Sequence, residues 1–467
     1  MELPGINKQL GSRQRQSLQI INIEAAFSLA SVVLAGGAFI TGLALHFGAS
    51  DFEIAVLAAI PFIAQIFQVI SAYFIDTTGR RKLLTVLSLL ISRIVLIGIA
   101  SLALLQGEWR LAALLALFAL NYVTFMTGAA GAISWFADLV QERIRGRFFA
   151  SRNTAIAIST LVAVMIGGVI IDQFTKHGYE EYGYFILFIL AGITGLVSVY
   201  LLWKLKDVPV QTRRDFYSIK YFFEPLRDKS YVKILLVFIS WNFAVGVSAP
   251  FFTPQMLKNL KMSFTLVALY SAGGAIMAVF FNRLWGKAID RFGCKPVSII
   301  TAFGISIIPF IWFFPRPDAL SILIFESLYS GIFWAGFNLS AFNFPIALSP
   351  LKKRTLYIAI FSVTTGLALF IGSLLAGLLA EEWKTVSISW GQQTIINYHL
   401  IFALSGILRL LSALFMLSFR EPNQKQETEV LYYMGNSIVR WISQGRQVFD
   451  MFIKGFDSIF IGKRDTD

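Results

Sequence analysis

Long apolar stretches alternate with short polar breaks along almost the whole chain, and each stretch is about as long as a membrane-crossing helix. Such a helix needs about 20 mainly apolar residues. Twelve stretches meet this length, and they run approximately over residues 20–45, 52–75, 83–105, 111–137, 148–171, 183–203, 232–252, 263–285, 297–314, 319–348, 356–380 and 398–419. The pattern predicts an all-α integral membrane protein with twelve transmembrane helices.

Polar segments divide the chain into five parts. We expect an N-terminal arm (1–19), an N-terminal six-helix bundle (20–203), a linker (204–231), a C-terminal six-helix bundle (232–419) and a tail (420–467). In the tail, apolar residues recur every three or four positions with basic residues between them, which is typical of an amphipathic helix on a membrane surface. A docking or regulatory role for this tail is the alternative to simple anchoring.

Composition narrows the class of protein further. Hydrophobic residues make up 56% of the 467 residues and charged residues only 14%, against about 45–50% and 25% in soluble domains. The single cysteine, Cys294, cannot form an intrachain disulfide or a multi-cysteine metal site. The sequence contains none of the common motifs of ATP hydrolysis, zinc hydrolases or serine hydrolases. We therefore expect neither an enzyme nor a bound metal or cofactor.

The net charge of +13 comes from basic residues in alternate breaks. One set of breaks holds 32 of the 40 Lys and Arg residues and the other set holds 6. Short basic loops stay on the cytoplasmic side of a membrane, so both termini, the linker and the tail are expected in the cytoplasm, with the protein in the cell (inner) membrane. Anionic lipid, and not nucleic acid, is the expected partner of this charge.

Two of the basic loops are copies of one motif. The loop after the second span reads Ala72 to Lys82, and the loop after the eighth span reads Gly286 to Pro296, at an offset of 214 residues. A motif repeated at the same place in two six-helix halves is typical of a duplicated transporter. Asp76 and Gly79 of the first copy align with Asp290 and Gly293 of the second. The other residues of interest are Arg80 and Arg81 in the first copy and Gly286 and Arg291 in the second.

On these residues the chain resembles the major facilitator superfamily, whose signature loop is G-x-x-x-D-R-x-G-R-[RK]. The first copy departs from it at Ala72 and Thr77. A further loop that runs from Asp138 to Arg147 and includes Arg145 is similar to the acidic-then-R-G loop of the family. The resemblance implies two pseudo-symmetric six-helix bundles, a central site between them lined by helices 1, 4, 7 and 10, and gating roles for these loop residues.

Two glutamates, Glu24 and Glu326, fall inside predicted spans, where a charged side chain costs at least about 2.5–3.5 kcal/mol. Such residues are paired or functional. Glu24 either couples transport to protons or pairs with a basic residue such as Arg152. Glu326 either contacts substrate or a proton, or belongs to a structural pair. For Arg93 and Arg409, which also lie in spans, structural roles are favoured.

Polar and aromatic residues in the spans expected to line the path are candidate substrate contacts. In the fourth span, small and polar residues share one helical face, which suits either cavity lining or helix packing. Pro250 and Pro254 predict a break near the end of the seventh span. The candidates are Asn121, Trp135, Trp241, Asn242, Tyr329, Trp334 and Asn338.

The sequence therefore predicts a secondary active transporter that moves a small solute by alternating access, with protons as the driving ion. The expected substrate is a small or amphipathic molecule, and the protein is expected to act as a monomer. The alternative is a non-transporting membrane assembly or receptor protein on the same fold.

Overall fold

Each predicted span is a helix in the computed structural model, which describes residues 12–208, 224–350, 354–390, 393–418, 429–430, 432–435 and 437. Within these residues, twelve helices are long and apolar enough to cross a membrane, so the predicted fold class is confirmed. The N-terminal arm, most of the linker and most of the tail lie outside the described residues.

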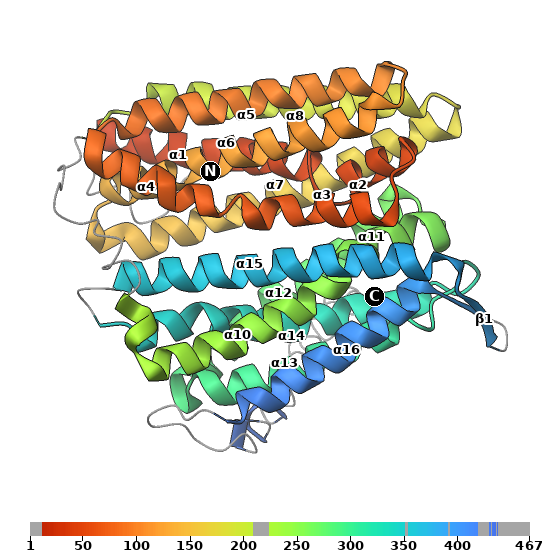
Figure 1. Ribbon diagram of the computed structural model, residues 1–467. Coiled ribbons are helices and arrows are strands. Elements are labelled where there is room, and N and C mark those ends of the chain that lie inside the picture. Colours follow the sequence, from red (N-terminus) through yellow and green to blue (C-terminus); the bar gives the residue numbers. More distant parts are fainter. Residues whose placement is uncertain are drawn as a thin grey trace, which may run out of the picture.

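The first six spans form one bundle and the last six form a second bundle, which lie one above the other in Figure 1. The N-terminal half contains α1 (Ser12–Leu34), α2 (Gly37–His46), α3 (Asp51–Ile63), α4 (Ile66–Thr78), α5 (Arg81–Leu104), α6 (Trp109–Leu139), α7 (Glu142–Lys176) and α8 (Glu180–Lys204).

The C-terminal half is also built almost entirely from helices. It contains η1 (Glu224–Arg227), α10 (Lys229–Ser248), η2 (Ala249–Phe251), α11 (Phe252–Pro254), η3 (Gln255–Asn259), α12 (Phe264–Phe292), α13 (Cys294–Ile311), α14 (Ser321–Leu348), α15 (Arg354–Glu382), η5 (Trp383–Thr385) and α16 (Asn397–Met416). A short antiparallel hairpin of β1 (Ser387–Trp390) and β2 (Gln393–Ile396), which pairs Ser387 with Ile396, precedes α16.

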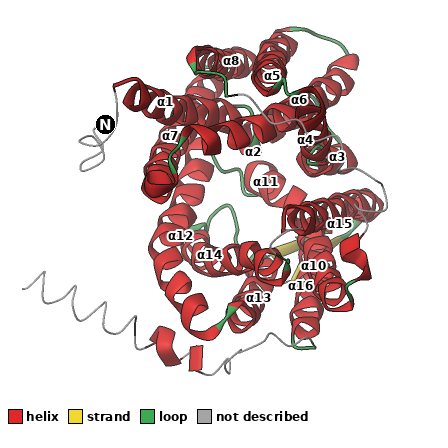
Figure 2. Ribbon diagram, turned by 90° about the vertical axis from the view of Figure 1, so that its left-hand side faces the viewer, coloured by secondary structure: helices red, strands yellow, loops and turns green. Residues whose placement is uncertain are grey.

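Each half packs around its own apolar core. One core gathers buried side chains of α2, α3, α5 and α8, and another gathers those of α10, α13 and α16. Across the boundary between the halves, α7 packs against α12 and α3 packs against α15, as Figure 2 shows with the helices viewed end-on. Large apolar side chains such as Ile324 (68% exposed) and Phe342 (67% exposed) remain uncovered by protein, as expected where lipid is the solvent.

The first and seventh spans are interrupted, although the sequence predicted a break only in the seventh. Gly36 is extended and Gly37 has φ +53°, a conformation that glycine adopts without strain. Pro250 lies 214 residues after Gly36, the offset of the loop repeat, and here α10 gives way to the 3-10 turn η2, α11 and the π-turn η3. Equivalent helices are therefore broken at equivalent positions by different residues.

We call the end of the bundle that carries residues 47–50, 105–108, 177–179 and 383–397 the distal end, at the right of Figure 1, and the opposite end the proximal end. The basic motif loops lie at the proximal end. The sequence predicts that the distal end faces outward, and this orientation stays a prediction.

Candidate functional site

A cavity of about 280 Å³ lies at the break of the first span, between the two halves. Backbone of Gly36 and Gly37 borders it, together with the side chains of Phe39 and Tyr122 from the N-terminal half. From the C-terminal half, α12 contributes residues including Phe264 and Ser271. Interrupted helices expose backbone polar groups to a ligand, and transporters use such breaks as binding sites. We call this space the inner cavity.

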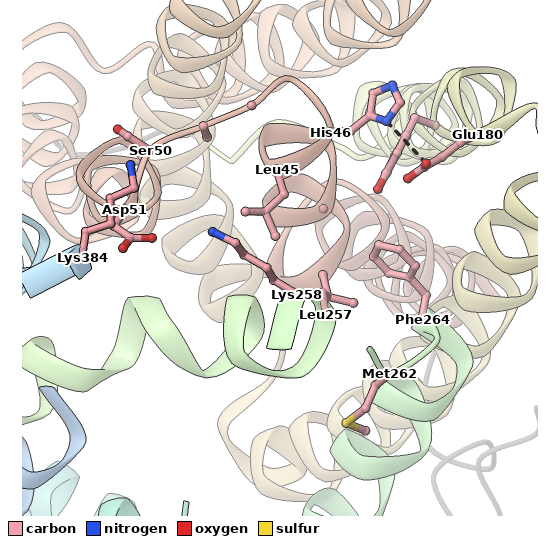
Figure 3. A pocket seen from close by; sticks show the side chains of 14 residues that line it. Leu45, His46, Ser50, Asp51, Glu180, Leu257, Lys258, Met262, Phe264 and Lys384 are labelled. Atoms are coloured by element: carbon pink, nitrogen blue, oxygen red, sulfur yellow. Dashed lines mark ion pairs between the residues drawn. The ribbon is translucent and has the colours of Figure 1, made fainter. Parts of the chain in front are cut away.

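A second cavity, of about 620 Å³, lies at the distal end, and we call it the vestibule. Figure 3 shows Lys258 and Leu257 of the C-terminal half facing Leu45 of the N-terminal half across it. His46 Nδ1 lies 3.4 Å from a carboxylate oxygen of Glu180 at its edge. The vestibule therefore carries charge of both signs, while the inner cavity is mainly aromatic and apolar.

Two carboxylates join the halves at the distal end. Asp51, at the start of α3, accepts hydrogen bonds from the Asn397 side-chain amide (2.7 Å) and the Tyr398 hydroxyl (2.6 Å) of α16. Asp172, in α7, accepts hydrogen bonds from the backbone N–H groups of Phe264 and Thr265, both at 2.8 Å. These bonds exist only while the distal ends of the two halves are together.

Glu24 lies buried in the N-terminal half, where it is 3% exposed. The Ser198 hydroxyl donates a hydrogen bond of 2.8 Å to its Oε1. Its Oε2 has no hydrogen-bond partner among the described residues, and Arg93 and Arg152 act on it electrostatically. Arg152, which the sequence suggested as a partner, is thus a neighbour, and its Nε is also without a hydrogen-bond partner in the described part of the chain.

Glu326 has a corresponding environment in the C-terminal half, where it is fully buried. The Tyr270 hydroxyl donates a hydrogen bond of 2.5 Å to Oε2, while Oε1 has no partner within the described ranges. Arg409 acts on Glu326 electrostatically and donates a 2.6 Å hydrogen bond to the Ser248 hydroxyl. Each half thus buries one carboxylate that has a close neutral donor on one oxygen and, within the described residues, no close hydrogen bond on the other, although Ser28 lies near Glu24 and Trp312 near Glu326.

Three predicted substrate contacts are buried against neighbouring helices in this arrangement. Asn121 donates to the Ser92 carbonyl at 2.8 Å and therefore faces α5. Trp135 is fully buried and donates to the Lys206 carbonyl at the proximal end. Trp241 is 1% exposed and stacks on the Phe337 ring at 4.5 Å. None of the three borders the inner cavity, because the helix faces that carry them pack against protein.

The other candidate contacts are partly or fully exposed. Asn242 donates to the Phe238 carbonyl one turn earlier at 2.8 Å, and Tyr329 donates to the Gly304 carbonyl at 3.0 Å. Trp334 packs on the core of the C-terminal half, and Asn338 is exposed. Their contact with substrate stays a prediction.

In each of the two motif loops, a glycine with a positive φ ends the preceding helix. Gly79 (φ +67°) ends α4 and Gly293 (φ +94°) ends α12, and each donates its N–H to the carbonyl four residues earlier. Arg81, which is 2% exposed, forms an ion pair of 2.6 Å with Asp138 and donates to the Val208 carbonyl. Lys295, at the same offset of 214, donates to the Leu417 carbonyl at 3.5 Å. Each loop is thus tied to the chain that follows the last helix of its own half.

The remaining gating candidates differ in their exposure. Arg80, Asp290 and Arg291 are exposed, while Asp76 and Gly286 are partly buried. Arg291 lies over the Tyr433 ring at 5.3 Å, which brings the described part of the tail onto the second loop. The side chain of Arg145 lies outside the described residues. Among those that are described, no group of His, Cys, Asp or Glu side chains is clustered for a metal ion.

Sequence reasoning missed Asp51, Asp172 and Phe264. The two aspartates lie at span ends, where a carboxylate is ordinarily solvated and gives no signal. The pair Gly36 and Gly37, aligned with Pro250 at the repeat offset, was the available sign of a broken first span.

Comparison with known proteins agrees with this architecture. The sequence profile of the Major Facilitator Superfamily matches residues 25–284 and 234–431. An uncharacterized MFS-type transporter of Methanocaldococcus jannaschii is 21% identical over 56% of this chain and 65% of its own length. A class H tetracycline resistance protein of Pasteurella multocida is 25% identical over 44% of this chain and 47% of its own length.

These matches span about half to two thirds of the length of the two relatives. The crystal structure of a D-xylose–proton symporter superposes with a TM-score of 0.67 over 89% of this chain and 100% of its own, at 17% identity, which supports the fold alone. The chain belongs to the Major Facilitator Superfamily, a family of multi-pass membrane transporters and not of enzymes.

Proposed function

We propose that this protein is a secondary active transporter that moves a small solute by alternating access, with protons carried by Glu24 and Glu326. The observation that carries the proposal is the buried carboxylate in each half, one oxygen of which has no close hydrogen bond among the described residues. Burying an ionised carboxylate without sufficient partners is unfavourable, whereas the protonated form is neutral. Such a group favours gaining a proton in one conformation and losing it in another.

The nearby arginines support a two-state role for these carboxylates. Arg93 and Arg152 act on Glu24, and Arg409 acts on Glu326. A cation close to a carboxylate stabilises its ionised form, so a small movement of a helix changes which form is favoured. Rocking of the two halves supplies that movement.

The substrate we propose is a small ring-bearing or amphipathic solute that binds in the inner cavity. Its volume of about 280 Å³ and its lining by Phe39, Tyr122 and Phe264 support an apolar ring. The Tyr122 hydroxyl supplies a polar contact beside Gly36. Asn242, Tyr329, Trp334 and Asn338 are proposed to contact the solute in another state of the cycle, when the halves have rocked.

The proposal is tested in proteoliposomes with a pH-sensitive dye inside. A thermal-shift panel of ring-bearing solutes that includes tetracycline and D-xylose selects the probe, because selective binding raises apparent stability. We expect addition of the probe to move protons in the wild type but not in Glu24→Gln or Glu326→Gln. Glu108→Gln, at an exposed glutamate in the loop before α6, is the matched control and should behave as wild type. Probe accumulation that is independent of the pH gradient would contradict proton coupling.

A further inference from the structure

The inner cavity and the vestibule share one aromatic side chain, Phe264. The inner cavity lies on the side of this ring that faces the break of the first span, and the vestibule lies on its distal side, where Figure 3 shows the ring among the lining residues. The Phe264 side chain therefore lies between the two spaces along the boundary of the halves.

The Phe264 ring belongs to the C-terminal half but is enclosed by the N-terminal half. It stacks on the Phe39 ring of α2 at a centroid distance of 5.9 Å and an angle of 15°. It meets the edge of the Tyr184 ring of α8 at 6.2 Å. A β-carbon at Gly42 would overlap the tip of the ring, so α2 leaves room for it only with glycine at that position. The ring fills a slot whose walls belong to the other half.

Asp172 fixes the backbone that carries this ring. Its two carboxylate oxygens accept the N–H groups of Phe264 and Thr265, one oxygen each. The N–H groups in the first turn of a helix have no partner within the helix, and a carboxylate is a favourable acceptor there. Ser263 already accepts the N–H of Leu266, as an ordinary N-cap residue does. Asp172 is therefore an additional cap supplied from the opposite half.

The backbones of α7 and α12 approach each other closely beside this cap. A β-carbon added at Gly168 of α7, one turn before Asp172, would lie 3.0 Å from the carbonyl carbon and oxygen of Phe264. A side chain at this position would push α12 away from α7. The start of α12 is thus held by two groups of α7, the close backbone contact at Gly168 and the carboxylate cap of Asp172.

We propose that Phe264 is the gate between the vestibule and the inner cavity, and that Asp172 is the residue that positions it. Separation of the distal ends would break both Asp172 hydrogen bonds and withdraw the ring from its slot, which connects the two cavities. The gate rests on the alternating access proposed above but not on proton coupling.

Thiol labelling in intact cells tests the gate. Cys294→Ser removes the native thiol, and Ser271→Cys places a reporter in the inner cavity, where this residue is exposed. A membrane-impermeant methanethiosulfonate reagent is added from the side that labels Lys258→Cys, the vestibule reporter. No substrate or pH gradient is applied, so a failure of transport or of proton coupling leaves this measurement readable.

We expect the Ser271→Cys reporter to label slowly with Phe264 present and nearly as fast as Lys258→Cys when Phe264→Ala is added. Phe264→Leu, which keeps most of the bulk, should restore slow labelling. Phe174→Ala, which removes a ring of equal size from the same end within one half, should leave labelling slow. Slow labelling in Phe264→Ala, with fast labelling of Lys258→Cys in that protein, would overturn the gate.

The positioning role of Asp172 has its own readout. Asp172→Asn keeps one acceptor and Asp172→Ala keeps none, so the labelling rate of Ser271→Cys relative to Lys258→Cys should rise in that order. A purely structural residue would lower thermal stability without changing this ratio. Adding Asp172→Ala to Phe264→Ala should not raise the labelling ratio further, because the aspartate acts by positioning the Phe264 ring. An unchanged ratio in Asp172→Ala, or an additive effect in the double variant, would overturn its assignment.

Discussion

Tyr398→Phe should release the distal ends of the two halves. The hydroxyl of Tyr398 donates a 2.6 Å hydrogen bond to Asp51 of the other half, and both side chains are buried, at 2% and 6% exposure. The substitution removes this bond and leaves the 2.7 Å bond from Asn397 in place. Because the bond exists only in the distally closed state, its loss shifts the equilibrium between closed and open forms.

The size of the shift follows from the type of hydrogen bond. A buried hydrogen bond to a carboxylate contributes about 1.5–3 kcal/mol, and 2 kcal/mol corresponds to roughly a 30-fold change in an equilibrium constant. We therefore expect the ratio of distally open to distally closed protein to rise roughly 30-fold, because each 1.4 kcal/mol of free energy corresponds to about a tenfold change in this ratio.

The assay is the rate at which the Ser271→Cys reporter is modified from the vestibule side. When opening and closing are fast compared with modification, this rate is proportional to the open fraction, even if that fraction is small. Tyr231→Phe is the matched control, because the Tyr231 hydroxyl donates an equally short bond, 2.6 Å, to the Tyr357 carbonyl within one half. Equal rates in Tyr398→Phe and Tyr231→Phe would refute the role of the Asp51 contacts in closure.

Three further substitutions test other parts of the structure. Gly42→Ala should displace the Phe264 ring and raise labelling of the reporter, whereas Gly98→Ala, where a β-carbon would lie 3.6 Å from Leu117, should not; equal effects in the two variants would contradict the tight slot. Gly37→Ala should lower the free energy of unfolding by about 1 kcal/mol in a thermal melt, because alanine is strained at the φ of +53° found here. An unchanged melting temperature would contradict this backbone conformation at the break. Arg81→Met should cost about 1–3 kcal/mol in the same melt, since Asp138 and the Val208 carbonyl lose a buried donor, while the exposed Arg80→Gln should be nearly neutral; the reverse order would contradict the anchoring role of Arg81.

The sequence predicted the spans well because the length of an apolar run reports directly on the thickness of a bilayer. It also predicted the paired loops, whose glycines Gly79 and Gly293 both have a positive φ, although only Gly79 is in the left-handed helical region. Proline made the break of the seventh span predictable, because Pro250 removes a backbone hydrogen-bond donor. Gly36 and Gly37 allow a helix to break but do not force it, so the break of the first span was not predicted.

The site was harder to predict than the fold. Helical periodicity shows which residues share a face but not whether that face meets a cavity or another helix. For Asn121 the sequence therefore left cavity lining and helix packing open, and in this structure its side chain donates to the Ser92 carbonyl. The contacts of Asp172 and Asp51 join residues of opposite halves, and nothing in a single sequence pairs such positions.

The most direct test of proton carriage by Glu24 and Glu326 is an infrared titration of the purified protein from mildly acidic to mildly alkaline pH. A buried protonated carboxyl group has a C=O stretch distinct from that of a carboxylate, so the proton is observed on the group itself. We predict a titrating carboxyl signal in the wild type that loses one component in Glu24→Gln and another in Glu326→Gln, and no loss in Glu108→Gln. A carboxyl signal that is identical in the wild type and in the Glu24→Gln/Glu326→Gln double variant would contradict the account.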